Sequence, residues 1–81
     1  MQLRINIMTL WDVPAKQTAT IKSLCPELAQ PVAARLEEMG FTPNQVATCI
    51  RKTPFSGPVV IQIGDCVYSI EQQLAQQIFI S

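Results

Sequence analysis

The three cysteines, Cys25, Cys49 and Cys66, have the widest range of chemistry in this sequence. A thiolate can bind a transition metal or attack an electrophile, but an attacking thiolate needs a base or a helix N-terminus to lower its pKa. The sequence contains no histidine, the commonest general base and metal ligand. The cysteines are odd in number and form no CxxC pair, which favours reduced, structural thiols. We therefore expect no catalytic residue, no metal site and no cofactor.

Charged side chains do not indicate an active site either. The carboxylates show no acid and base paired on one rigid element; they are Asp12, Glu27, Glu37, Glu38, Asp65 and Glu71. Six basic and six acidic residues give a net charge of zero, and no basic stripe could neutralise a nucleic-acid backbone. No segment approaches the roughly 20 apolar residues that cross a bilayer. We expect a cytoplasmic protein that binds no nucleic acid and does not itself span a membrane.

The elements that would position these side chains begin with an N-terminal arm, residues 1–9. Within it Leu3, Ile5 and Ile7 alternate with polar residues, which is typical of a half-buried strand or an edge arm. Leu10 and Trp11 lead into a turn at residues 12–14. A strand is predicted over residues 18–24, which are rich in β-branched side chains.

A helix is predicted over residues 31–39, because proline fits the first turn of a helix and Gly40 ends it. Three apolar residues fall on one stripe of this helix: Val32, Leu36 and Met39. If Gly40 adopts a left-handed conformation, Phe41 contacts Leu36 and seals the helix end.

The second half of the chain predicts strands separated by tight turns. Residues 45–52 form a strand with Val46, Thr48 and Ile50 on one face. The cluster Pro54-Phe55-Ser56-Gly57-Pro58 then forces a turn before the next strand, residues 59–63. Gly64-Asp65 is a two-residue hairpin loop.

That loop fixes the register of the hairpin. The expected cross-strand pairs are Ile63 with Cys66, Ile61 with Tyr68, and Val59 with Ile70, all on one buried face. A slip of one residue would expose three aliphatic side chains, at roughly 1.5–3 kcal/mol each. In this register Cys66 faces the buried side beside Ile63, and Cys49 points to the opposite face.

A short helical turn over residues 71–75 and a closing strand over 78–80 complete the prediction. The fold class is mainly β, a single domain over residues 1–81. Many short strands in a small chain favour a closed or nearly closed β-barrel, with one inserted α-helix and a short C-terminal helical turn. A plain antiparallel sheet with one helix is the alternative.

Residues 36–43, Leu-Glu-Glu-Met-Gly-Phe-Thr-Pro, resemble a motif of the FeoA family, the ferrous iron transport protein A family. The proline and glycine hairpin at residues 54–58, the segment 61–75 and the leading segment 10–24 are similar to that family in order and spacing. The resemblance covers residues 10–80. Three residues depart from the family pattern: Asn44 and Ser56 replace residues that are commonly glycine or small, and Glu71 replaces a usual arginine.

The resemblance implies an SH3-like barrel that works with the membrane-embedded ferrous iron transporter FeoB. We expect binding to the cytosolic GTPase part of FeoB, peripheral to the inner membrane. The expected contacts are Phe55, Ser56, Gly57, Phe41, Trp11 and Arg51. The alternative for Phe41 is a helix-end plug, and Glu71 reverses the charge of the arginine that is usual at its position. The fold also occurs in iron-dependent repressors, but this chain has no room for their DNA-binding module.

Two other functions stay open at this point. A soluble ferrous iron chaperone or sensor could use cysteine and carboxylate ligands. Alternatively the domain could alter GTP hydrolysis by its partner, with Arg51 near an exposed loop as the candidate arginine finger. A solvated surface arginine is the simpler interpretation of Arg51. The sequence does not fix the oligomeric state.

Overall fold

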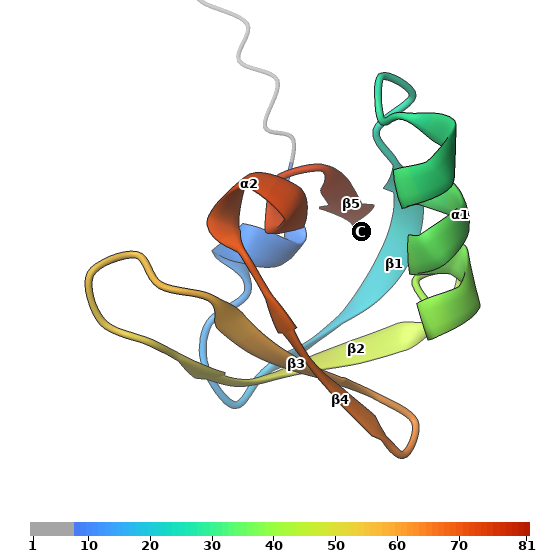
Figure 1. Ribbon diagram of the computed structural model, residues 1–81. Coiled ribbons are helices and arrows are strands. Elements are labelled where there is room, and N and C mark those ends of the chain that lie inside the picture. The colour runs from blue at the N-terminus through green and yellow to red at the C-terminus, as the bar shows by residue number, and fades with distance from the viewer. Residues whose placement is uncertain (1–7) are drawn as a thin grey trace, which may run out of the picture.

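The computed structural model of the chain describes residues 8–81 (Figure 1). Its elements are a 3-10 helix η1 (Leu10–Asp12), strand β1 (Thr18–Leu24), helix α1 (Gln30–Met39), strands β2 (Val46–Lys52), β3 (Val59–Ile63) and β4 (Cys66–Ile70), helix α2 (Gln72–Ala75) and strand β5 (Ile78–Ile80). The mainly β fold class is confirmed. The predicted arm lies outside the described residues except for Met8 and Thr9, and the turn expected after Trp11 is replaced by η1.

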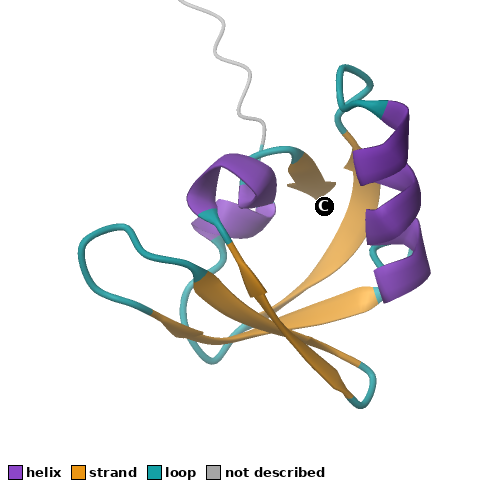
Figure 2. Ribbon diagram, in the orientation of Figure 1, coloured by secondary structure: helices purple, strands orange, loops and turns teal. Residues whose placement is uncertain are grey.

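The strands form one antiparallel sheet in the order β4-β3-β2-β1-β5. The sheet curls, and both helices lie over its concave side (Figure 2). This order makes β4 and β5 the two edges, and the short helix α2 connects them. The fold is therefore a curled, barrel-like sheet that hydrogen bonds between β4 and β5 do not close.

The β3–β4 hairpin has the predicted register. The cross-strand pairs include Ile63 with Cys66, Ile61 with Tyr68, and Val59 with Ile70. Gly64 has φ 58° at the first position of the loop, where a type II′ turn requires glycine. The turn chemistry and the burial pattern therefore agree.

The predicted buried position of Cys66 is wrong. Cys66 is exposed although it shares a face with Ile63, because it lies at the end of the hairpin, beyond the packed part of the sheet.

The predicted face of β2 needs a correction. Its buried residues are Ala47 and Cys49, whereas Val46 is 55% exposed. The pairing with β3 shifts between Cys49 and Arg51, which marks a β-bulge at Ile50. The alternation is regular from Val46 to Cys49 and places Cys49, which pairs with Ile61, in the core; the bulge shifts the register only beyond Cys49. Cys49 and Cys66 therefore lie on the same face of the sheet, and their expected placement on opposite faces is wrong.

Helix α1 ends as the sequence predicts. Gly40 has φ 109°, and its N–H donates to Glu37 O at 3.1 Å. The N–H of Phe41 donates to Leu36 O at 3.0 Å, which completes a Schellman motif. Leu36 and Phe41 are both buried. The predicted stripe is only partly correct, because Val32 is 37% exposed near the beginning of the helix.

We expect Gly40→Ala to lower the free energy of unfolding by about 1 kcal/mol or more, since a Cβ is unfavourable at positive φ. The added Cβ would also lie 3.1 Å from Ile63 Cγ2, in tight contact with the hairpin. Urea denaturation of the two proteins measures the difference. An unchanged unfolding midpoint would contradict this account of the helix end.

One apolar core holds the sheet and helices together. Its largest fully buried side chains come from η1, from four of the strands, from α1 and from the residue after Gly40. They are Leu10, Ile21, Leu36, Phe41, Cys49, Val59, Ile61 and Ile78. The buried cluster contains no polar or charged side chain among the described residues. The two helices and η1 thus cover one continuous core.

Candidate docking surface

The loop between β2 and β3 presents a phenylalanine to solvent. The side chain of Phe55 is 100% exposed. The loop is closed by two hydrogen bonds, from Gly57 N–H to Pro54 O at 3.1 Å and from Thr53 Oγ1 to Pro58 O at 2.8 Å. The two prolines have restricted φ angles. The loop is therefore held in one conformation by its own residues.

The tip of this loop has an unusual backbone. Phe55 has φ 60° and Ser56 has φ 58°, although neither is glycine. A left-handed conformation costs roughly 1–2 kcal/mol for such a residue. Gly57 cannot be enlarged without disturbance, because an added Cβ would collide with Thr53 Oγ1. Residues held in such conformations cluster at functional sites, which makes the loop tip a candidate site.

Trp11 lies at the base of the same loop. The Asp12 carboxylate holds η1 in place by accepting from Thr9 N–H at 2.9 Å and Thr9 Oγ1 at 3.0 Å. Lys52 Nζ donates to Trp11 O at 3.0 Å and lies 5.8 Å from the centroid of the indole ring. A cation at this distance is attracted to the face of the ring. Because Lys52 directly precedes Thr53, this contact connects η1 with the loop.

The other two predicted contacts differ in their exposure. Arg51 is exposed on β2, next to Lys52. Phe41 is 0% exposed, and its ring centroid lies 5.9 Å from that of Tyr68. An exposed contact at Phe41 is therefore excluded, and the residue is the helix-end plug. The other predicted contacts, together with Lys52, which the structure adds, are called the loop surface below: Trp11, Arg51, Lys52, Phe55, Ser56 and Gly57.

The three cysteines do not form a site. Cys25 is partly buried in the β1–α1 connection, Cys49 is buried on β2, and Cys66 is exposed on β4. No group of three cysteine or carboxylate side chains in residues 8–81 is arranged to hold a metal ion. The Cys66 thiol lies beside Tyr68 and raises the pKa of its phenol, chiefly through a hydrogen bond. The cysteines therefore contribute to packing and local contacts.

Burial raises the pKa of the Cys49 thiol, and nearby Lys52 partly opposes this effect. A thiol with a raised pKa in the folded state keeps its proton where the unfolded chain has lost it, so the free energy of unfolding falls as pH rises above the ordinary thiol pKa. We expect stability to decline between pH 8 and pH 10, as measured by urea denaturation. Cys49→Ala should flatten that decline, and an identical slope would contradict the assignment.

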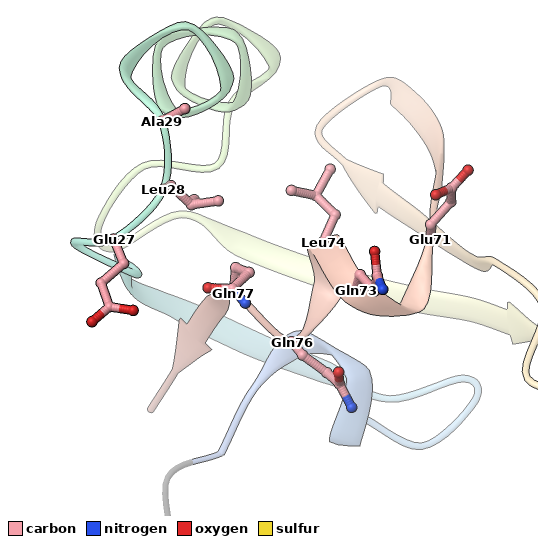
Figure 3. A pocket seen from close by; sticks show the side chains of 8 residues that line it. All are labelled: Glu27, Leu28, Ala29, Glu71, Gln73, Leu74, Gln76 and Gln77. Carbon is pink, nitrogen blue, oxygen red and sulfur yellow. The ribbon is translucent and has the colours of Figure 1, made fainter.

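A polar cleft of about 550 Å³ lies between the β1–α1 connection and α2. Leu28 and Leu74 project into it from opposite sides, and the glutamine side chains of α2 and its end border it (Figure 3). Glu27 and Glu71 stand at separate rims of the cleft. The two carboxylates do not converge on a point, so this geometry does not form an acid–base pair.

Helix α1, with ten residues, is the longest helix in the part of the chain that the structure describes. None of the helices in residues 8–81 has the length and hydropathy needed to cross a membrane.

Comparisons with known proteins identify the fold and a family. The FeoA domain family model matches residues 8–81. The zinc-complexed FeoA of Stenotrophomonas maltophilia, described as a procaryotic SH3 domain protein, superposes with a TM-score of 0.81 at 25% identity, covering 91% of this chain and 89% of that one. No curated protein sequence matches the chain.

Two further structures give the same fold. The iron(II) transport protein A of Clostridium thermocellum has a TM-score of 0.82 at 26% identity, and the match covers 91% of this chain and 44% of that one. A manganese-dependent transcriptional repressor has a TM-score of 0.78 at 16% identity, covering 91% of this chain and 40% of the repressor. At that identity the repressor supports the fold alone.

Proposed function

Because this chain belongs to the FeoA family, we propose that it docks on the cytosolic GTPase part of the ferrous iron transporter FeoB through the loop surface. The family assignment makes it an accessory protein of ferrous iron transport. The Stenotrophomonas relative has been suggested to act as a ferrous iron transport activating factor. Docking on FeoB would hold the chain in the cytoplasm, peripheral to the inner membrane.

The observation that carries this proposal is the exposure of Phe55 on a closed, strained loop. A phenylalanine gains about 1.5–3 kcal/mol when it leaves water for an apolar pocket. A loop held in one conformation by its own hydrogen bonds loses little entropy on binding, so more of that energy appears as affinity. Aromatic anchors of this kind often dominate a protein interface.

Neighbouring side chains extend the surface beyond a single ring. Trp11 adds a partly exposed indole ring, and Arg51 and Lys52 add positive charge at the base of the loop. Glu71 lines a shallow hollow together with Ser56 and Pro58, so the positive charge is confined to the Arg51 and Lys52 side of the loop. A complementary site on FeoB would combine an apolar socket for Phe55 with carboxylates that face Arg51 and Lys52.

Phe55→Ala should weaken binding to the purified cytosolic domain of FeoB at least about tenfold, or about 1.4 kcal/mol. Isothermal titration calorimetry with the full chain measures the affinity. Alanine also lacks a preference for positive φ, so the backbone strain of the loop changes little and the fold should be unaffected.

Val67→Ala is the matched control for this measurement. Val67 is also an exposed apolar residue, at 55%, but it lies on β4 outside the loop surface. Its replacement should leave the affinity for FeoB unchanged. Equal affinities of the wild-type chain and Phe55→Ala would remove the loop from the interface.

We also propose that docking modulates GTP hydrolysis by FeoB, with Arg51 placed to contact the GTPase. An arginine that stabilises the transferring phosphate accelerates hydrolysis by 10³ or more. Turnover by the FeoB cytosolic domain, measured with the wild-type chain and with Arg51→Ala at saturating concentration, separates docking from rate enhancement. The chaperone alternative has no comparable support, because the described cysteines are not grouped; saturable anaerobic Fe²⁺ binding below the millimolar range would revive it.

A further inference from the structure

The edge strand β4 lacks the usual protection against pairing with another chain. Its residues Cys66–Ile70 contain no charged side chain and no proline, which are the common devices that keep an edge from pairing. The opposite edge, β5, is partly covered: Thr9 pairs with Phe79, and Ile80 N–H donates to Met8 O at 3.0 Å. Among residues 8–81, one edge of the sheet is thus covered by the chain itself and the other is open.

The register of the hairpin shows which backbone groups face outward from β4. Ile63 and Cys66 flank a two-residue loop and form a hydrogen-bonded pair. Hydrogen-bonded and non-hydrogen-bonded pairs then alternate along an antiparallel ladder. The N–H and C=O groups of Val67 and Ser69 therefore point away from β3, where they could form hydrogen bonds with a sixth strand.

A groove of about 370 Å³ runs beside this edge, between β4 and α1. Its lining is mainly apolar and includes Val32, Leu36, Met39, Tyr68, Ile70 and Leu74. Tyr68 and Ile70 lie on the concave face of β4, paired with the buried Ile61 and Val59. Alternate side chains of an added strand would therefore cover the groove.

The sequence contains a segment with that pattern. Leu3, Ile5 and Ile7 alternate with polar residues in the part of the chain that precedes the described residues, and the FeoA match begins only at residue 8. Residues 3–7 equal β4 in length. Thr9 pairs with Phe79, one residue before β5 ends at Ile80. If this antiparallel pairing continued toward the N-terminus, residues 3–7 would extend past the end of β5 and would have no residue of β5 to pair with.

We propose that residues 3–7 of one copy of this chain add as a sixth strand to β4 of a second copy. Leu3, Ile5 and Ile7 would lie over the groove, and Arg4 and Asn6 would share the outer face with Val67. Reciprocal exchange of the two arms gives a symmetric dimer with both open edges covered. The proposal concerns the assembly of this chain and does not depend on binding to FeoB.

Sedimentation velocity over a series of protein concentrations tests the proposal. The full chain should approach about 18 kDa, twice its 9.0 kDa mass, whereas the chain without residues 1–7 should stay monomeric. Ile5→Asp should weaken self-association at least about tenfold. Asn6→Asp adds the same charge on the opposite side of the arm and should leave it unchanged.

Mixing two impaired variants separates arm exchange from other contacts. The chain without residues 1–7 keeps an open β4, and Ser69→Pro removes an outward N–H from β4 but keeps the arm. Each alone should be monomeric, and their mixture should form a heterodimer. Dimers that persist without the arm, as in direct pairing of two β4 edges, would overturn the proposal. A full chain that stays monomeric at every concentration would also overturn the proposal, because its groove would then be free or covered by its own arm or by another protein.

Discussion

Phe41→Ala should lower the free energy of unfolding by about 3–5 kcal/mol, the usual cost of removing a buried aromatic ring from a core. The Phe41 side chain is completely buried and contacts the ring of Tyr68 across the helix end. Small domains have total stabilities near 5–15 kcal/mol. The variant should therefore unfold at much lower urea concentration, or fail to fold at 37 °C.

Phe55→Ala is the internal control for this prediction, because the same substitution is made at a fully exposed site. Its free energy of unfolding should stay within about 0.5 kcal/mol of the wild type, as for most surface changes. Equal losses at the two positions would mean that Phe55 packs against the domain and that the loop surface is wrongly assigned.

Ile61→Ala should lower the free energy of unfolding by about 2–5 kcal/mol, because the cavity left in the middle of β3 cannot collapse between two neighbouring strands. Ile61 is 0% exposed and pairs with Cys49 on β2 and Tyr68 on β4. Urea denaturation monitored by the fluorescence of Trp11 measures the loss.

Val67→Ala serves here as well, since Val67 lies on the neighbouring strand and is exposed. It should change the free energy of unfolding by less than about 0.5 kcal/mol. A small loss for Ile61→Ala together with a large one for Val67→Ala would mean that the hairpin register is shifted by one residue.

The parts of the fold that were correctly predicted depend on local rules. Gly64 fixes the β3–β4 register because a two-residue loop permits only one closing pair. Gly40 ends α1 because the left-handed residue of a Schellman motif is nearly always glycine. Neither inference required knowledge of distant contacts.

The errors arise where tertiary packing decides which part of a regular strand is buried. The alternation Val46, Thr48, Ile50 predicted the wrong buried face, because Ala47 and Cys49 occupy the core instead; the bulge at Ile50 shifts the register only beyond them. The sequence carries no marker of that bulge, such as a glycine. The hairpin register correctly places Cys66 on the same face as Ile63, but burial ends before the tip of the hairpin, so the thiol is exposed.

The candidate site was only partly predictable. Proline and glycine around Phe55 indicated an exposed turn, but the left-handed backbone of Phe55 and Ser56 could not be inferred from residue types that avoid it. The contact of Lys52 with Trp11 was missed, because it joins residues 41 positions apart.

Glycine or asparagine at positions 55 and 56 would suit positive φ better than the phenylalanine and serine that occupy them. Selection for heat resistance alone should therefore replace the aromatic ring at the loop tip and improve the fold. Homologues that no longer need a partner would be expected to drift in that direction. Thermal stability and partner binding thus favour different residues at positions 55 and 56 of this loop.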